Sequence, residues 1–213
     1  YKVYLGGRDG GSQIVAPADE AIHAAILAVA DTSVVPELPR SSDYDLADES
    51  VIDAYVERTA ALVPRTPEAP VIDPVRFVYT AMHGVGWEVA QRVFAAAGLG
   101  EPTVVAEQIA PDGAFPTVAF PNPEEPGAMD LSFATARAAD AELIIANDPD
   151  ADRLAVAIPD PTAAEGWRRL TGNEVGALLG WRAAERLRRE ERQAKFAASL
   201  VSSPALSAVA NAY

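Results

Sequence analysis

The chain has 213 residues, of which 49% are hydrophobic and 23% charged, as is typical of a soluble globular protein with one large or two modest domains. It contains no Cys, which excludes disulfides, thiolate nucleophiles and Cys-based metal sites. The net charge of −14, the lack of a membrane-length apolar stretch and the lack of a signal-peptide pattern predict a cytoplasmic protein without nucleic-acid or membrane partners.

The chain begins with a short strand and a glycine-rich turn. We predict a strand at residues 2–5, a turn at 6–11 and a second extended segment at 12–15. The turn is expected to be a flexible hairpin, because a phosphate-binding loop would lead directly into a helix. A helix at residues 18–30 follows, with acidic residues in its first turn that favour the helix dipole, and then a Pro-bearing linker at 31–45.

Helices and strands alternate in the central part of the chain. Helices are predicted at residues 48–62, 87–97 and 130–138, and strands at 75–80, 103–106, 143–146 and 154–158. Alternation of helices with apolar strands is typical of the α/β class, so we predict mixed, mostly parallel sheets flanked by helices. Ligands of such sheets bind beyond the carboxyl ends of the strands.

A third segment begins near residue 159 and contains one helix with a clear start. Thr171 is the predicted N-cap of this helix, and Glu174 is its capping-box partner. A strand at residues 196–201 and the start of another helix are predicted after it. The chain starts within a strand, without Met, and stops within this last helix, so we expect it to be an internal part of a longer protein.

An acidic segment, Asn-Asp-Pro-Asp-Ala-Asp-Arg, directly follows the third strand of the central part. Asp148, Asp150 and Asp152 alternate along it, and carboxylates this crowded repel one another unless a cation lies among them. Oxygen ligands without His or Cys favour Mg²⁺ over zinc or copper. Arg153 adds a guanidinium to the same loop, a combination that suggests phosphoryl chemistry.

Other interpretations of this acidic segment can be compared by residue pattern. A solvated turn rich in Asp and Pro stays open on the sequence alone. An EF-hand calcium loop needs Gly at its sixth and Glu at its twelfth position, and these positions hold Arg153 and Pro159. A phosphatase whose first Asp is the nucleophile usually has Thr or Val at the fifth position of the motif, which here is Asp152. The third carboxylate therefore favours a metal site.

His83, one of two histidines in the chain, is a second candidate site residue. Gly84 and Gly86 beside it allow a ligand to come close to the main chain, and the helix that follows attracts anions to its N-terminus. Alternatively, His83 caps this helix or forms a hydrogen bond within the turn. The other histidine, His23, lies in an Ala-rich predicted helix, and we expect it to be structural.

Four segments, in the right order, resemble the α-D-phosphohexomutase superfamily, which interconverts 1- and 6-phosphosugars or 1- and 5-phosphopentoses. They are TAMHGVG at residues 80–86, FPTVAFPNPEEP at 115–126, NDPDADR at 147–153 and LTGNEVGALL at 170–179. Within the superfamily, they are similar to the bacterial phosphoglucomutase/phosphomannomutase branch related to animal phosphopentomutases. The resemblance covers essentially the whole chain.

The resemblance implies a four-domain enzyme of which this chain is a part. Residues 1–42 would be the C-terminal part of domain 1, residues 43–158 the metal-binding domain 2, and residues 159–213 the N-terminal part of domain 3. In this family a phosphoserine of domain 1 donates its phosphoryl group to the sugar, and the resulting sugar bisphosphate returns the other phosphate. The phosphosugar and this bisphosphate are therefore the expected ligands.

The family's site residues carry over where this sequence matches them. The resemblance implies Mg²⁺ binding by three carboxylates: Asp148, Asp150 and Asp152. Arg153 would stabilise the transferring phosphoryl group. Lys2 is similar to a family lysine that acts as a general acid or base, and His83 would line the substrate cleft.

Three motifs of the family do not occur in this sequence: the serine loop, the acidic loop that reads the sugar and the phosphate clamp. We therefore expect that this polypeptide alone does not catalyse the mutase reaction. Two other functions stay open, a non-catalytic α/β module that binds a phosphosugar or a partner, and a Mg²⁺-dependent phosphatase that releases inorganic phosphate. Glucose, mannose and pentose phosphates all stay open as substrates.

Overall fold

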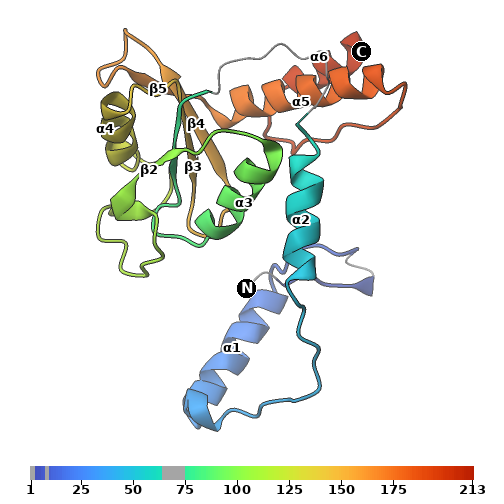
Figure 1. Cartoon of the computed structure of the whole chain (residues 1–213). Coiled ribbons are helices and arrows are strands. Elements are labelled where there is room, and N and C mark those ends of the chain that lie inside the picture. The colour runs from blue at the N-terminus through green and yellow to red at the C-terminus, as the bar shows by residue number, and fades with distance from the viewer. Residues whose placement is uncertain (1–2, 8–9, 64–74) are drawn as a thin grey trace. The chain divides into compact units, whose positions relative to one another are not determined.

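The computed structural model describes residues 3–7, 10–63 and 75–213, so the predicted site residue Lys2 lies outside the described residues. The chain forms two compact units, Tyr1–Ala47 and Asp48–Tyr213 (Figure 1). None of the described helices is both long and apolar enough to cross a membrane. The division into three domains, with boundaries after residues 42 and 158, stays a prediction.

The first unit contains a hairpin and one long helix. Tyr4 and Gln13 form an antiparallel bridge, and two main-chain hydrogen bonds flank it. The described residues on either side of the glycine-rich segment therefore pair as in a hairpin, as predicted. Helix α1 spans Ala18–Ala30, which is the predicted range, and a short 3-10 helix, η2, follows at Val35–Glu37.

The second unit is built on a mixed sheet of five strands with the order β2-β1-β3-β4-β5. The strands are β1 (Phe77–Thr80), β2 (Thr103–Val104), β3 (Leu143–Asn147), β4 (Leu154–Pro159) and β5 (Trp167–Arg169). The neighbours β2, β1 and β3 are parallel, whereas β3, β4 and β5 are antiparallel. The predicted α/β class with a mixed sheet is confirmed. Strand β5 was not predicted.

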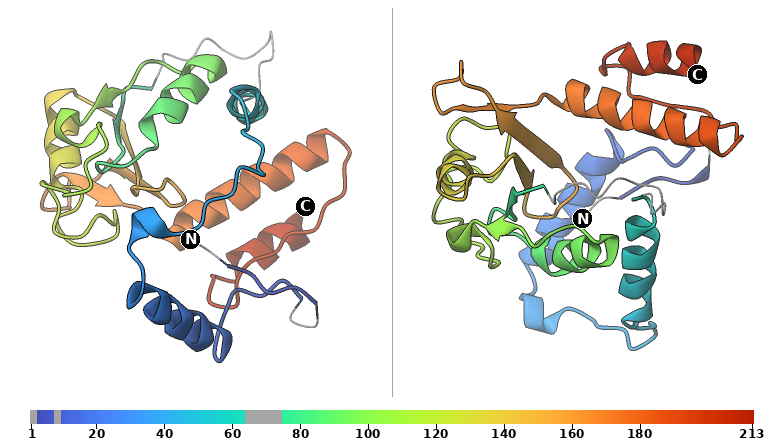
Figure 2. Two further views of the ribbon diagram at one scale, coloured as in Figure 1. Left: turned by 90° about the horizontal axis from the view of Figure 1, so that it is seen from below. Right: turned by 45° about the horizontal axis from the view of Figure 1, so that its top comes forward.

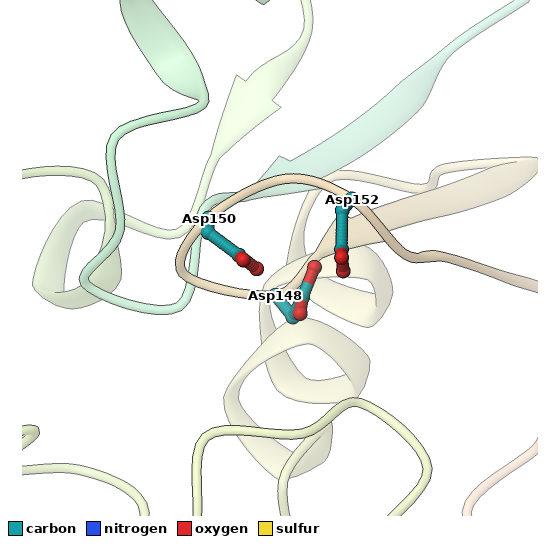
Figure 3. A group of neighbouring side chains, drawn as sticks. All are labelled: Asp148, Asp150 and Asp152. Carbon is teal, nitrogen blue, oxygen red and sulfur yellow. The ribbon is translucent and has the colours of Figure 1, made fainter. Parts of the chain in front are cut away.

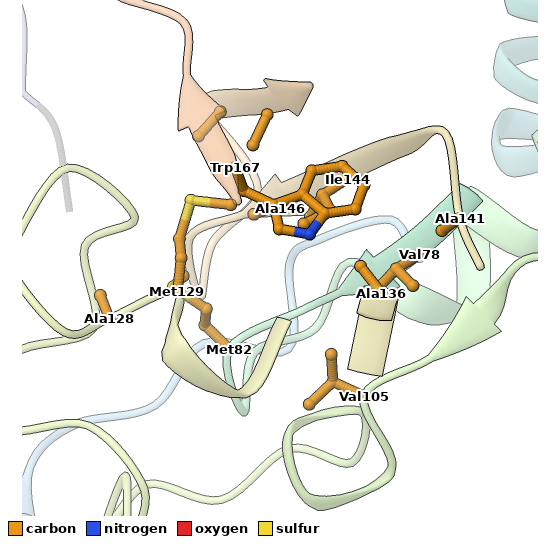
Figure 4. Packing of buried hydrophobic residues seen from close by; sticks show 12 residues of the cluster. Val78, Met82, Val105, Ala128, Met129, Ala136, Ala141, Ile144, Ala146 and Trp167 are labelled. Carbon is orange, nitrogen blue, oxygen red and sulfur yellow. The ribbon is translucent and has the colours of Figure 1, made fainter. Parts of the chain in front are cut away.

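Helices cover both faces of this sheet, which explains why all four residues of β1 are buried. On one face, the rings of Phe77 and Tyr79 pack edge-on against Phe94 of α3, with centroids 5.2 and 5.7 Å apart. On the other face, Val78 joins a core cluster with Ala136 of α4 (Figure 4). These helices are α3 (Trp87–Ala97) and α4 (Asp130–Ala138). Successive β1 side chains point to opposite faces, as expected for a strand.

Two further helix pairs complete the second unit. Helix α2 (Ser50–Ala60) packs against α3, where Arg92 forms ion pairs with Glu49 and Asp53. Helix α5 (Gly172–Arg189) lies beside α6 (Ala205–Ala212) in all views (Figures 1 and 2). A second 3-10 helix, η3, spans Ala106–Gln108 and is separated from β2 by Val105.

The predicted strand at residues 196–201 is wrong. These residues have no strand conformation, and Leu200 and Val201 are exposed. A segment with high strand propensity still needs a neighbouring strand for its hydrogen bonds. Within the described part of the chain no strand pairs with this segment.

The predicted capping box at the start of α5 is confirmed. The Thr171 hydroxyl accepts a hydrogen bond from the Glu174 amide over 3.2 Å, and the Glu174 carboxylate accepts one from the Thr171 amide over 2.7 Å. Arg168 donates to the same carboxylate over 2.8 Å. The Thr171 amide first, and then Arg168, hold the pKa of Glu174 at about 2, well below its ordinary value.

We expect the substitution Glu174→Gln to destabilise α5 in a pH-dependent way. Because the folded-state pKa is lowered, the carboxylate stabilises the fold fully above its unfolded pKa of 4.5 and loses this effect as the pH falls towards about 2. The free energies of unfolding of the wild type and Glu174→Gln, measured with urea, should therefore differ at pH 7. They should become similar as the pH falls from 4.5 towards about 2. Glu185→Gln, on the same helix but outside the cap, is the control for loss of a charge. If the difference in unfolding free energy between the wild type and Glu174→Gln did not change with pH, the charge of Glu174 would not be what stabilises α5.

Candidate functional site

The acidic loop, residues 148–153, connects β3 to β4 at the carboxyl end of β3. Asn147 and Leu154 face each other across the two strands, so the loop between them turns sharply. Within it, one carboxylate oxygen from each of Asp148, Asp150 and Asp152 lies within 4.8 Å of the others (Figure 3). The three predicted metal ligands are therefore brought together by the structure.

Asp148 is fully buried, and its charge is paired with Arg153. The Arg153 amide donates to Oδ1 over 2.9 Å and its Nε donates to Oδ2 over 2.7 Å. This hydrogen bond to Asp148 is also the main reason that the pKa of Arg153 is raised. A buried carboxylate needs such a partner, because desolvation without compensation costs several kcal/mol. The guanidinium has further N–H donors beyond Nε, and half of its side chain is exposed, at 52%.

The donor set of this loop fits a hard divalent cation. The loop carries three carboxylates but only one guanidinium, so negative charge is in excess. Arg153 Nε lies 2.7 Å from the Asp148 carboxylate but 3.6 Å from that of Asp152. Asp150 and Asp152 are exposed. Among the bonds between described residues, each oxygen of Asp148 accepts one hydrogen bond, from Arg153, which leaves one lone pair on each for a cation. Oxygen donors of this kind suit Mg²⁺.

The loop that carries His83 packs directly against the acidic loop. The Val85 amide donates to the Pro149 carbonyl over 2.9 Å. A Cβ atom on Gly84 would overlap the main chain of Pro149, and one on Gly86 would lie 3.1 Å from the Ala151 side chain. The two loops meet as expected, because they follow the parallel neighbours β1 and β3.

Two residues that were not predicted hold the ends of the acidic loop. Asn147 donates through Nδ2 to the Arg153 carbonyl over 2.8 Å, and it accepts from the Tyr79 hydroxyl over 3.0 Å. Burial raises the pKa of Tyr79 to about 12, so its hydroxyl stays protonated and able to donate. Ala151, in the middle of the loop, has a left-handed backbone with φ 56°, which is unfavourable for a residue with a Cβ.

His83 is buried, with 4% of its surface exposed. Its Nε2 lies 2.8 Å from the Thr117 hydroxyl, so its ring forms a hydrogen bond beyond the turn in which it lies. Phe115 contacts the ring edge-on. The part of His83 in substrate binding stays a prediction. Thr117 was not predicted as a site residue, although it lies in the FPTVAFPNPEEP segment.

Comparison with known proteins relates most of this chain to one enzyme family. Residues 53–162 match the family model for phosphoglucomutase/phosphomannomutase, alpha/beta/alpha domain II. A probable phosphomannomutase of Haemophilus influenzae is 53% identical over 213 residues, which are 100% of this chain and 42% of that protein. The phosphopentomutase of Homo sapiens is 41% identical over 192 residues, 85% of this chain and 29% of that protein.

A solved structure of a phosphoglucomutase/phosphomannomutase family protein from Burkholderia thailandensis is similar, with a TM-score of 0.54 and 27% sequence identity. The match covers 80% of this chain and 32% of the solved one. The chain thus spans less than half the length of the relatives it matches.

We expect Gly84→Ala to displace the acidic loop. The added Cβ would overlap the Pro149 main chain, so one of the two loops must move, at about 1–3 kcal/mol of stability. Mg²⁺ is the cation predicted for this loop, and affinity for it, measured by calorimetry, should fall on the order of tenfold. Gly113→Ala is the matched control, because a Cβ there has no atom within 4 Å. Equal Mg²⁺ affinity of Gly84→Ala and Gly113→Ala would show that the contact between Gly84 and Pro149 does not position the acidic loop.

Proposed function

The chain belongs to the phosphoglucomutase/phosphomannomutase family, and on this basis we propose that it is the metal-binding part of a phosphosugar mutase. The observation that carries the proposal is the cluster of three carboxylates in the acidic loop, joined by the guanidinium of Arg153. The reaction would move a phosphoryl group between the 1- and 6-positions, or the 1- and 5-positions, of a sugar phosphate. An enzyme phosphoserine and a sugar bisphosphate would be its intermediates.

The carboxylates and the guanidinium of the acidic loop would have different roles. Asp148, Asp150 and Asp152 would hold Mg²⁺, which supplies neutralisation of phosphoryl charge when it is bound. Asp148 also fixes Arg153 through two hydrogen bonds. The remaining guanidinium donors would bind the equatorial oxygens of the transferring phosphoryl group, where negative charge is greatest in the transition state.

Other parts of the proposal extend beyond this loop. Lys2 would act as a general acid or base, and His83 would contribute to the substrate site. The ligands would be the phosphosugar and its bisphosphate, with no nucleic-acid or membrane partner, and the cytoplasm is the expected compartment. The 213 residues would not turn over substrate alone, because the serine loop, the sugar-reading loop and the phosphate clamp of the family do not occur in the sequence.

Product analysis of the intact protein that carries this sequence tests the proposed activity. Phosphorus NMR with glucose 1-phosphate, mannose 1-phosphate and ribose 1-phosphate should show the isomeric sugar phosphate in at least one reaction. Release of inorganic phosphate without isomerisation would identify a phosphatase instead. Binding of a sugar phosphate without turnover would identify a non-catalytic module.

Asp150→Asn in the intact protein is expected to weaken Mg²⁺ binding and to lower turnover. Loss of one ligand charge removes part of the attraction for the cation, and the effect on affinity or activity should be on the order of 10–100-fold. Mg²⁺ titrations of the mutase rate measure it. The control is Glu101→Gln, which removes the same charge at an exposed residue. Glu101 precedes β2, at the amino end of this strand, whereas the acidic loop follows the carboxyl end of β3. Unchanged turnover at saturating Mg²⁺, together with an unchanged Mg²⁺ concentration for half-maximal rate, would contradict the metal role.

Arg153→Lys is expected to reduce kcat far more than it changes KM. Lys keeps the positive charge beside Asp148 but lacks the planar set of donors, so transition-state hydrogen bonds are lost and kcat should fall by about 10²–10³. Steady-state kinetics separate the two constants. Arg76→Lys, which changes an exposed Arg paired with Asp140 and Glu142, is the control. A raised KM with wild-type kcat would assign Arg153 to ground-state binding.

A further inference from the structure

A hydrogen-bond network of four side chains connects the end of β1 to His83, and of its members only Thr117 is exposed. The Thr80 hydroxyl donates to Gln108 Oε1 over 2.8 Å, and Gln108 Nε2 donates to the Thr117 hydroxyl over 2.9 Å. Thr117 in turn lies 2.8 Å from His83 Nε2. Thr80 is 0% and Gln108 1% exposed. Polar groups this deeply buried are tolerated only when they are bonded, and here both ends of the Gln108 amide have partners.

The donors and acceptors can be assigned for the bonds made by Thr80 and Gln108. Thr80 gives its proton to Gln108 and accepts from the Met82 amide over 3.1 Å. Because Gln108 Nε2 donates to Thr117, the Thr117 hydroxyl proton remains to be given. Among the described residues, His83 Nε2 lies 2.8 Å from this hydroxyl, and which of the two atoms donates depends on the tautomer of His83. The network thus connects Thr80 to His83 through Gln108 and Thr117.

This network holds an unfavourable turn in place. Met82 and His83 have φ of 47° and 61°, the left-handed region that residues with a Cβ rarely adopt. The Met82 amide is bound by Thr80, and the His83 amide donates to the Gln108 carbonyl over 2.8 Å. The His83 carbonyl accepts from the Asp112 amide over 2.9 Å. Hydrogen bonds of the His83 amide, of its carbonyl and of its ring compensate for the backbone strain of this turn.

The turn transmits its position to the acidic loop. Gly84 follows His83 directly and packs on the Pro149 main chain without room for a Cβ, and the Val85 amide is bound to the Pro149 carbonyl. Pro149 lies between Asp148 and Asp150, two of the three clustered carboxylates. A shift of the His83 turn would therefore move the main chain that carries these ligands.

We propose that Gln108 and Thr117 are positioning residues of the phosphosugar mutase site, which set the geometry of the acidic loop through the left-handed turn at His83. The inference rests on the proposed function for its consequence in catalysis. Its structural part, the coupling of Gln108 and Thr117 to the acidic loop, stands without a bound metal.

Three substitutions test the proposal in the intact protein. Gln108→Met keeps the length of the side chain but removes both polar ends, and Thr117→Val removes only the hydroxyl. Thr117→Ser keeps the hydroxyl and should restore wild-type behaviour. Thr135→Val is the matched control, because it removes a Thr hydroxyl that is bonded to the Leu131 carbonyl within α4.

Two measurements distinguish positioning from general support of the fold. Calorimetry well below the unfolding temperature should show Mg²⁺ affinity lowered on the order of tenfold in Gln108→Met and Thr117→Val, but not in Thr117→Ser or Thr135→Val. Hydrogen exchange should be faster in the first two variants at the Val85 and Arg153 amides, which are bonded to Pro149 and Asp148.

Each outcome decides a separate question. Wild-type Mg²⁺ affinity and wild-type exchange at both amides, together with a lower unfolding temperature, would show that the network supports the fold only and would overturn the proposal. If the wild-type protein takes up no Mg²⁺, the proposed function fails. The exchange rates then still decide whether Gln108 and Thr117 hold the acidic loop.

Discussion

The buried charge of Asp148 is the constraint on which the site depends. A carboxylate with no exposed surface must be paired, and Arg153 pairs with it through both its amide and its guanidinium. Because the two residues are five positions apart, the chain between them has to turn back on itself. Ala151 makes this turn with a left-handed backbone, and its amide bonds the Asp148 carbonyl over 2.9 Å. The same turn brings Asp150 and Asp152 beside Asp148.

The parallel pairing of β1 and β3 supplies the second constraint. It places the loops that follow these strands at one edge of the sheet, where Gly84 and Pro149 touch. A residue with a side chain at position 84 would force the loops apart. Segments that are more than 60 residues apart in sequence therefore behave as one structural unit, with the acidic loop on one side and the His83 turn on the other.

Features encoded by short patterns were predictable from the sequence, and features that depend on distant partners were not. The alternation of Asp148, Asp150 and Asp152 and the spacing of Thr171 and Glu174 are local, and the structure shows both groups brought together. Strand propensity at residues 196–201 could not reveal that no strand lies beside them in the described chain, and β5 has only 3 residues. The bonds from Thr80 to Gln108 and from His83 to Thr117 span 28 and 34 residues, so no periodicity indicates them.

The acidic composition of the chain makes the rigidity of this site important. A net charge of −14 repels an anion such as the proposed phosphosugar at long range, so attraction has to come from a few cations at short range. Coulomb energy falls with distance, and salt screens exposed charges beyond about 10 Å. A guanidinium that moved freely would lose much of its effect to water and to neighbouring carboxylates. Arg153 is instead fixed by Asp148 through Nε, and the loop that carries both is held by the His83 turn and the polar network below it. These contacts fix the orientation of the Arg153 guanidinium, so one arginine can attract an anion although the chain as a whole repels it.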